Sequence, residues 1–445
     1  MKNILILGAG LSTNILIDYL LKNSVEYNWH VTIADINEDL AKQKLNGHSN
    51  GKALAFNIED DELTVKAIAD NDIVISMLPA FMHKKIALKC IDMRKPMLTA
   101  SYASDDIKEL NDKAKKAGIP LYMELGLDPG IDHMSAMNVI NKIKDDGNEL
   151  TSFYSFTGGL VAPDSDNNPW NYKFTWNPRN VVMAGNGVSQ FIKNGRYKYI
   201  PYHRLFDRAF NRKILEYGDF EVYANRDSLK YRSIYDLKDI PSMFRGTIRR
   251  PGFSKAWNVF VRLGMTEDNY TLESSENMTY RQFLNSFLRY EPNVPAEIKL
   301  QEYCSNAADP VVMEKLKWLG IFDERKIGLK NATPAQILQQ LLEERWSMDP
   351  QDKDMIVMQH EFKYLTDGVE KMIVSAMAVI GKNQTETAMA ITVGLPLAIA
   401  TKLLMLGKFN HTGVILPTEK QMYEPILDEL STFGITFEEN EYLIG

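Results

Sequence analysis

The stretch Asn3-Ile4-Leu5-Ile6-Leu7-Gly8-Ala9-Gly10-Leu11-Ser12-Thr13 decides the fold of the first part of the chain. Its apolar start predicts a buried strand, and residues 14–22 beyond the glycines predict a helix. In such a turn the first glycine permits a tight bend, and the second lets the backbone approach a phosphate group. The helix adds free N–H groups and the positive end of its dipole. The stretch therefore predicts a pyrophosphate site whose contacts are Gly8, Gly10, Leu11 and Ser12.

An acidic residue closes the second predicted strand at the spacing of a dinucleotide site. Asp35 follows Gly10 by about 25 residues, and a carboxylate at this point can bind the 2′-hydroxyl of a ribose. It would repel a 2′-phosphate, and residues 36–38 contain neither Arg nor Lys, so NAD is favoured while NADP stays possible. Two alternatives stay open. The turn can lack a ligand, since its third position is Thr13, and Asp35 can serve only as a helix cap.

Residues 1–130 alternate short apolar runs with helical stretches, which is typical of β-α-β units around a parallel sheet. This pattern predicts a Rossmann domain with six strands, Asn3–Leu7, His30–Ala34, Ala53–Phe56, Ile73–Leu78, Met97–Ala100 and Leu121–Leu125. The fourth strand ends at the carboxyl edge, where ligands of such sheets lie. Leu78 and Pro79 are therefore candidate cofactor contacts, although Pro79 can also be a simple strand terminator.

The rest of the chain has a different pattern. Aromatic-rich strands are predicted at Thr151–Thr157, Tyr172–Trp176, Phe220–Tyr223, Asp354–Phe362 and Val369–Ala378, with helices near 313–319 and 334–345. The fold class is thus α/β, with an N-terminal Rossmann domain followed by two further parts. These are a mixed α+β substrate domain with a largely antiparallel sheet (131–277 and 347–389) and a helical insertion (278–346). Whether residues 390–445 pack back on the first domain stays open.

Composition excludes several classes of protein. The 445 residues are 24% charged and 45% hydrophobic, with a net charge of −7, which disfavours a nucleic-acid partner. Two cysteines, Cys90 and Cys304, cannot build a disulfide framework or a cysteine zinc site, so we expect no metal and a reducing, cytoplasmic location. The apolar stretch 389–407 contains Gly394, Pro396 and Lys402, so we expect buried helix and loop there and no membrane span.

Further motifs resemble a known family. They are Thr99-Ala-Ser-Tyr102, Glu124-Leu-Gly-Leu-Asp-Pro-Gly-Ile-Asp-His133, Thr157–Pro163, Asn168–Pro169, Tyr172–Trp176, Asn225–Ser228, Arg245–Arg249, Asp354–Phe362 and Thr392–Thr401. In this order they resemble the saccharopine dehydrogenase family, closest to the glutamate-forming saccharopine reductases. The resemblance implies hydride transfer between a nicotinamide and the imine that joins glutamate to 2-aminoadipate semialdehyde. It also implies a small amino-acid substrate with several carboxylates and a homodimer.

The resemblance and the expected strand edges together select the catalytic candidates. Asp128, after the sixth strand, is the first choice, and Tyr102, after the fifth strand, can donate a hydrogen bond to the substrate. Asp128 can alternatively cap a helix that begins near Gly130, and Tyr102 can simply pack. Ser101, in the same motif as Tyr102, is a candidate cofactor contact. A structural role is favoured for His133 and His360.

Arginines suit a substrate with several carboxylates, because their planar fork binds a carboxylate at two points. Arg226 and Arg245 lie in family-like motifs and are the best candidates, with Lys173 as a weaker one. Surface salt bridges are the alternative, and Arg249 and Arg250 are expected to be solvated. Gly158 and Gly159 would let a substrate approach the backbone. Thr157 stands where the resemblance suggests a cysteine in fungal enzymes, so no thiol is available there.

Two other functions compete with this interpretation. A carboxynorspermidine synthase-like imine reductase would act on a cationic substrate, against which the two arginine motifs argue. A non-catalytic nucleotide-binding relative would keep the fold alone. For the favoured function, we expect the substrate in a cleft between the first two domains.

Overall fold

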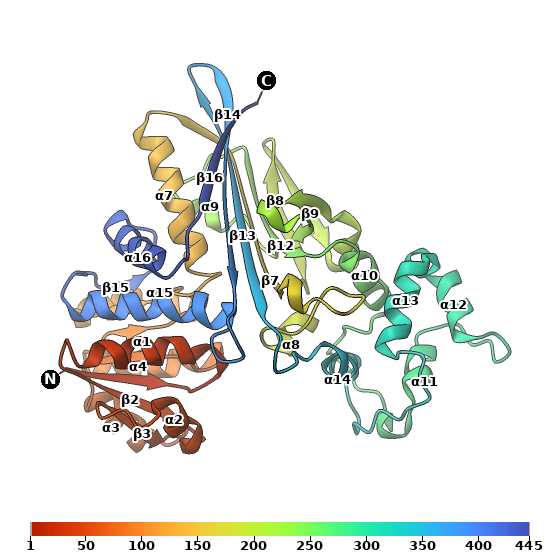
Figure 1. Cartoon of the computed structure of the whole chain (residues 1–445), viewed down its shortest axis with the longest axis horizontal. Coiled ribbons are helices and arrows are strands. Elements are labelled where there is room, and N and C mark those ends of the chain that lie inside the picture. The colour runs from red at the N-terminus through yellow and green to blue at the C-terminus, as the bar shows by residue number, and fades with distance from the viewer. Residues whose placement is uncertain (1, 445) are drawn as a thin grey trace. The chain divides into compact units, whose positions relative to one another are not determined.

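The computed structural model describes residues 2–444, which divide into two compact units (Figure 1). The first unit comprises the chain up to Gly147 together with Gly381–Phe437, and the second comprises Asn148–Ile380 together with the residues from Glu438 onward. The first unit thus extends 17 residues beyond the boundary predicted at residue 130. The helix that follows it packs on α16 of the first unit, where Asn141 Nδ2 donates a hydrogen bond to Tyr423 OH at 2.8 Å.

The first unit is built on a parallel sheet whose strand pairs are all parallel. Residues Ile4 to Leu7 of its first strand are completely buried, as expected for a sheet covered on both faces. A seventh strand from late in the chain extends the six that were predicted. In spatial order the strands are β15 (Gly413–Ile415), β6 (Pro120–Tyr122), β5 (Met97–Leu98), β4 (Ile73–Ser76), β1 (Lys2–Leu7), β2 (Trp29–Asp35) and β3 (Gly51–Ala55).

Helices connect and cover these strands. They are η1 (Leu11–Thr13), α1 (Asn14–Ser24), α2 (Glu38–Leu45), α3 (Asp61–Ala69), η2 (Ala80–Met82), α4 (His83–Asp92), α5 (Asp105–Lys108), α6 (Asn111–Ala117), α7 (Ile131–Asp145), α15 (Ala388–Met405) and α16 (Lys420–Thr432).

Helix α15 is long and apolar enough to cross a membrane by length and composition, and 72% of that stretch is buried inside the structure. It runs alongside α1 (Figure 1). A Cβ at Gly394 would lie 2.9 Å from the backbone nitrogen of Leu16, so the glycine permits this close contact between helices. The expected buried helix covers Ala388–Met405 and continues through Gly394 and Pro396, and a turn follows at residues 406–407.

The second unit contains a mixed sheet in which β12 and β7 are parallel and the other pairs are antiparallel. Its main path is β10 (Phe210–Lys213), β11 (Asp219–Ala224), β12 (Ser242–Arg249), β7 (Glu149–Val161), β13 (Asp354–Thr366), β14 (Val369–Ile380) and β16 (Glu438–Leu443). The hairpin of β8 (Val188–Lys193) and β9 (Arg196–Pro201) attaches to β12.

The helices of the second unit share one core with its sheet. They are α8 (Pro178–Val182), α9 (Tyr231–Ile234), α10 (Phe253–Leu263), α11 (Tyr280–Asn285), α12 (Ala296–Tyr303), α13 (Pro310–Leu319) and α14 (Pro334–Trp346). Trp346 of α14 packs against Trp170, with ring centroids 5.2 Å apart, in a core that also contains Phe156 of β7. The segment 278–346 is therefore part of the second unit and not a separate domain.

The strand predicted at Tyr172–Trp176 is also absent. Tyr172 and Phe174 lie in an irregular segment. Both rings pack on Trp346, with centroids 5.0 and 5.4 Å from the centroid of its ring. Their aromatic character reflects burial in the core, which periodicity alone cannot separate from a strand.

Candidate active site

The glycine turn has the geometry of a phosphate-binding loop. Gly8 has a φ of +99°, and a Cβ there would lie 2.9 Å from the carbonyl oxygen of Met77, so only glycine fits. Gly10 has an ordinary extended backbone, and a Cβ there would meet no described atom within 4 Å. Neither conformation nor packing requires a glycine at this second position. Open space at Gly10, together with the exposed Leu11, fits a dinucleotide phosphate at the start of η1.

Asp35 is fixed beside this turn by two backbone N–H groups. Its Oδ2 accepts a hydrogen bond from Ala9 N at 2.7 Å, and its Oδ1 accepts one from Asn37 N at 2.8 Å. The cap of α2 is Asn37, whose side chain accepts from Leu40 N. The alternative of Asp35 as a helix cap is therefore wrong. Its carboxylate instead ties the end of β2 to the turn, where a ribose of the cofactor would bind.

At the edge of the sheet, a buried histidine connects two strands. His83 Nδ1 lies 2.9 Å from Ser76 Oγ, at the end of β4, and His83 Nε2 lies 2.8 Å from Ser101 Oγ, beyond β5. Burial lowers the pKa of His83 to about 4, so the imidazole is neutral near pH 7. A neutral ring can donate to one serine and accept from the other. Leu78 is partly buried and Pro79 exposed at the same edge.

Tyr102 and Asp128, the two predicted catalytic residues, are in contact. The Tyr102 hydroxyl donates a hydrogen bond to Asp128 Oδ1 at 2.8 Å. Tyr102 is 40% exposed, so solvent can reach the pair. Gly130 is the cap of α7, and its N–H donates a hydrogen bond to Asp132 Oδ1. The alternative of Asp128 as a helix cap is therefore wrong, and its carboxylate accepts a hydrogen bond from a phenol instead.

A buried carboxylate lies behind this pair. Glu124 Oε1 accepts a hydrogen bond from Ala103 N at 2.9 Å, and its Oε2 lies 2.6 Å from Nε2 of His133 on α7. The backbone of Glu124 has a φ of +62°, an uncommon conformation for this residue type. Glu124 thus connects the loop that carries Tyr102 to the first turn of α7.

In the second unit, the two predicted arginine motifs are joined by their backbones. Asn225 N donates to the carbonyl oxygen of Arg245 at 2.8 Å, and Arg245 N donates to Ser228 Oγ at 2.9 Å. The Arg245 side chain is buried, with its guanidinium 4.0 Å from the ring centroid of Tyr231. Arg226 is exposed. Both candidates for carboxylate binding therefore lie on adjoining segments.

Other predicted substrate residues have different surroundings. Lys173 Nζ lies 2.5 Å from Asp352 and 3.3 Å from Asp349, and its side chain is 4% exposed, so its charge is already matched inside the protein. A Cβ at Gly158 would lie 2.7 Å from the carbonyl oxygen of Ile248. Gly158 thus permits close strand packing, and the space that we expected it to leave for a substrate is filled. Gly159 is its neighbour on β7 and pairs with Ile356.

The expectation that Arg249 and Arg250 are solvated is wrong. Arg249 is 2% exposed, and its guanidinium lies 5.0 Å from the ring centroid of Tyr172 and 5.3 Å from that of Phe253. Arg250 donates to the carbonyl oxygen of Tyr217, and burial lowers its pKa. Aromatic rings take the place of water around both groups.

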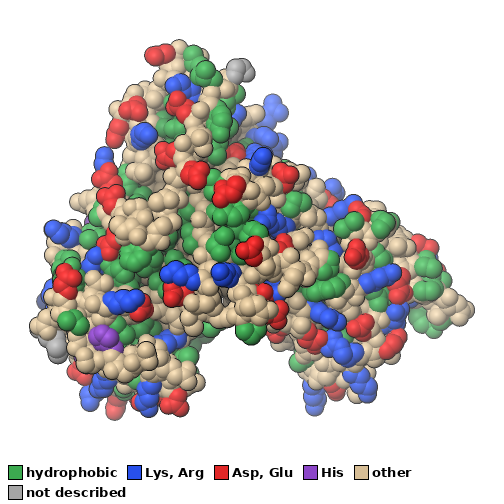
Figure 2. Space-filling model, viewed as in Figure 1, with side chains coloured by type: hydrophobic (Ala, Val, Ile, Leu, Met, Phe, Trp, Pro, Cys, Tyr) green, Lys and Arg blue, Asp and Glu red, His purple; other side chains and the backbone are tan. Residues whose placement is uncertain are grey.

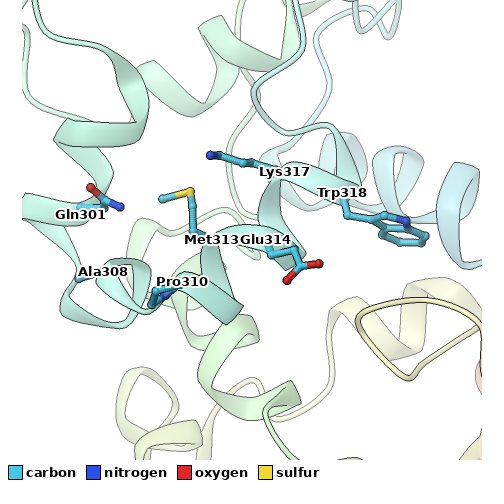
Figure 3. A pocket seen from close by; sticks show the side chains of 7 residues that line it. All are labelled: Gln301, Ala308, Pro310, Met313, Glu314, Lys317 and Trp318. Atoms are coloured by element: carbon cyan, nitrogen blue, oxygen red, sulfur yellow. The ribbon is translucent and has the colours of Figure 1, made fainter.

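A cavity of about 700 Å³ lies elsewhere, on the helices of the second unit (Figure 3). Met313 and Lys317 extend from α13 toward Gln301 of α12, and none of the lining residues is a predicted site residue. On the face of the molecule in Figure 2, positive and negative side chains are interspersed.

A parallel sheet with a glycine turn, a carboxylate after its second strand and a Tyr–Asp pair at its edge defines a nicotinamide-dependent oxidoreductase. Residues 4–121 match the saccharopine dehydrogenase NADP binding domain, and residues 126–435 match the saccharopine dehydrogenase C-terminal domain. The chain belongs to the saccharopine dehydrogenase family.

Similar proteins cover the whole chain. It is 32% identical to saccharopine dehydrogenase [NADP(+), L-glutamate-forming] of Saccharomyces cerevisiae, over 98% of this chain and 99% of that protein. It is 34% identical to alpha-aminoadipic semialdehyde synthase of Arabidopsis thaliana, of which it spans 40%. The apo structure of the L-Glu-forming enzyme from S. cerevisiae superimposes with a TM-score of 0.90 at 31% identity, covering 99% of this chain and 100% of that one. Homospermidine synthase of Legionella pneumophila shares the fold alone, with a TM-score of 0.55 at 11% identity.

Sequence reasoning gave no role to Ser76, His83, Glu124 or Lys44. Glu124 stood inside a family-like motif, and Ser76 ended a predicted strand, so their positions were visible in the sequence. Their partners were not, because each contact joins segments that only the folded sheet brings together.

Proposed function

We propose that this protein oxidises the C–N bond of saccharopine and releases glutamate. The bound nucleotide would accept a hydride from carbon, and nitrogen would lose a proton, which gives an imine. Water then cleaves the imine to glutamate and 2-aminoadipate semialdehyde. The contact between Tyr102 and Asp128 at the sheet edge carries this proposal. Two relatives that match over 99% of their own length are named saccharopine dehydrogenase [NADP(+), L-glutamate-forming], which supports it.

The Tyr102–Asp128 pair suits the proton transfers of this reaction. The glycine turn and Asp35 would hold the dinucleotide, whose nicotinamide would supply the hydride acceptor. The Asp128 carboxylate can take the proton that nitrogen loses, while the Tyr102 hydroxyl holds the carboxylate in place. Because Tyr102 is 40% exposed, the proton can pass on to solvent. Imine hydrolysis also needs water, which the same exposure admits.

We assign substrate carboxylates to Arg226 and Arg245. The Arg245 guanidinium lies over Tyr231, which holds it in a low-dielectric setting where a charge-assisted bond is strong. Thr157 Oγ1, on the neighbouring strand β7, is buried and makes no hydrogen bond within residues 2–444. It is therefore a further group that can bind a polar substrate atom.

We propose that NAD is the preferred cofactor and that NADP is accepted. The relatives' names favour NADP. Asp35 favours NAD, because its carboxylate is held by Ala9 and Asn37 where the ribose would bind. A 2′-phosphate there would meet a fixed negative charge, and two unit charges about 4 Å apart repel by about 4 kcal/mol at an effective dielectric constant of 20.

The test is turnover of saccharopine by the purified protein with NAD or NADP, followed by identification of glutamate. We expect formation of reduced nucleotide with both cofactors and a higher kcat/KM with NAD. Asp128→Asn should lower kcat by about 100-fold, and Tyr102→Phe by less, because the carboxylate remains. Neither change should alter the Kd for NADH. Intact protein that binds NADH and leaves saccharopine unchanged would overturn the proposal.

We also propose a cytoplasmic homodimer. The two cysteines, Cys90 and Cys304, are both buried and unpaired by disulfides, which suits a reducing compartment. Sedimentation of the purified protein at micromolar concentration would test the dimer, and a monomer mass would reject it.

A further inference from the structure

A lysine from α2 reaches into the glycine turn. The ammonium of Lys44 donates hydrogen bonds to the carbonyl oxygen of Gly10 and, at 3.0 Å, to Thr13 Oγ1. Thr13 is buried and its hydroxyl donates to the same carbonyl at 2.7 Å. Lys44 therefore lies against the two residues that begin and end the first turn of the helix.

The same ammonium lies near Asp35. Burial lowers the pKa of Lys44 to about 8, and attraction to Asp35 opposes this effect. Lys44 is thus largely charged near pH 7 and only partly hydrated. Asp35 in turn contacts Ala9, the neighbour of Gly10, so both charges border the place where the adenosine ribose would bind.

We propose that Lys44 is a second selectivity residue of the ribose subsite, whose ammonium binds the 2′-phosphate of NADP and lets the site accept it despite Asp35. The inference rests on the proposed function in that the turn binds a dinucleotide. It concerns this chain's own residues and requires no particular amino-acid substrate.

Electrostatics explains why one lysine is enough to matter. A 2′-phosphate bound at this subsite would be repelled by Asp35 and attracted by Lys44, so the two effects would oppose each other. A lysine is a flexible point charge, and its three N–H donors can leave Gly10 for a phosphate without moving α2. An enzyme with Asp35 alone would reject NADP, whereas the Asp35–Lys44 combination permits both nucleotides.

The chain provides a matched control on the same helix. Lys42 forms ion pairs with Glu38 at 3.2 Å and Asp39 at 3.7 Å, and its side chain is 55% exposed. Lys42→Met removes one positive charge from α2, as Lys44→Met does, but it leaves the contacts with Gly10 and Thr13 intact.

The experiment is calorimetric titration of the full-length protein and its variants with NADH and with NADPH. We expect Lys44→Met to weaken NADPH binding by about tenfold relative to NADH. Lys44→Arg should retain the NADPH binding of the unmodified protein. Lys42→Met should leave the ratio of the NADPH Kd to the NADH Kd unchanged, and Asp35→Asn should lower this ratio. Adenosine 2′,5′-bisphosphate and AMP differ only in the 2′-phosphate, and both compete with NADH for the site. Lys44→Met should weaken competition by adenosine 2′,5′-bisphosphate more than competition by AMP, without any contribution from the nicotinamide half.

The outcomes separate this inference from the proposed function. Equal loss of NADH and NADPH in Lys44→Met would mean that the lysine only shapes the turn, and it would overturn the inference. A ratio of the NADPH Kd to the NADH Kd that is the same in Lys44→Met as in the unmodified protein would overturn it too. So would the absence of measurable NADPH binding by the unmodified protein. A protein that shows the expected ratios but does not oxidise saccharopine would retain the inference and lose the proposed function.

Discussion

The imidazole of His133 and the carboxylate of Glu124 form a buried contact, with Nε2 and Oε2 2.6 Å apart. Glu124 also accepts a hydrogen bond from Ala103 N, directly after Tyr102. His133 lies on the first turns of α7, five positions after Asp128. The contact therefore connects the two segments that present the proposed catalytic pair.

Replacing His133 should lower both stability and activity. His133→Leu removes one donor from a buried carboxylate, which costs about 3 kcal/mol of unfolding free energy. Because the loop with Tyr102 loses support, kcat should fall while the Kd for NADH changes little. Urea unfolding and steady-state kinetics measure the two effects.

His133→Gln is the matched control for this contact, since its amide can still donate to Glu124. It should retain more of the stability and of kcat than His133→Leu. Equal losses in both variants would show that the size of the imidazole, and not its hydrogen bond, is what matters.

Gly10→Ala should separate cofactor binding from folding. The added methyl group meets no described atom within 4 Å, and the backbone conformation suits any residue, so the melting temperature should stay the same. The methyl group would occupy the space proposed for the pyrophosphate, and NADH binding should weaken by about tenfold or more. Calorimetry measures the Kd for NADH, and thermal melting measures the melting temperature.

Gly8→Ala offers the contrasting result two positions earlier. Its φ of +99° and the 2.9 Å approach to Met77 make any side chain strained there. This variant should lose about 1–3 kcal/mol of stability. A Gly10→Ala protein that binds NADH normally would contradict the proposed phosphate position.

The turn and Asp35 were predictable because their signals are local. Gly8, Gly10 and the strand before them are adjacent in the sequence, and Asp35 follows at a spacing fixed by one helix and one strand. Tyr102 and Asp128 were selected by the family resemblance together with their positions just beyond two strands of one parallel sheet. Since the carboxyl ends of parallel strands share one edge of a sheet, the sequence could indicate that the two residues lie near each other.

The contacts of His83, Glu124 and Lys44 were not predictable, because they depend on tertiary packing that has no local sequence signal, although the partners lie only 7 to 34 positions away. Arg249 shows the same limit. Its charge suggested solvent exposure, yet Tyr172, 77 positions earlier, covers its guanidinium. Residues 172–176 have the composition of a strand, but the rings of Tyr172 and Phe174 pack against Trp346 instead. Tertiary contacts outweighed local preference at each of these places.

The buried His83 should make stability depend on pH. Its pKa is lowered to about 4 in the folded protein, from about 6.5 when unfolded. Below about pH 6.5 the unfolded chain takes up a proton that the folded protein refuses, so stability is full above this range and falls toward pH 4. Between about pH 7 and about pH 5 the loss from this residue should be about 2 kcal/mol.

His83→Gln tests the assignment, because an amide can still bridge Ser76 and Ser101 but does not titrate. Urea unfolding at the two pH values should show a smaller difference for this variant than for the unmodified protein. The same pH dependence in both proteins would assign the effect to other groups.

Gly394→Ala should destabilise the protein, against the usual effect of this change. In a helix interior the replacement of glycine by alanine normally stabilises by about 1 kcal/mol. Here the new Cβ would lie 2.9 Å from the backbone nitrogen of Leu16 and 3.3 Å from Cβ of Ile15, and neither can move without shifting α1. Forcing the two helices apart should cost about 1–3 kcal/mol.

Ala390→Gly, one turn earlier in α15, is the control for helix propensity. Propensity alone predicts that Ala390→Gly lowers the melting temperature and that Gly394→Ala raises it. Close packing predicts that both changes lower it. Because α1 begins at the glycine turn, the loosened Gly394→Ala protein should also bind NADH more weakly, whereas Ala390→Gly should not. A more stable Gly394→Ala protein would show that the contact between α1 and α15 has room for a methyl group.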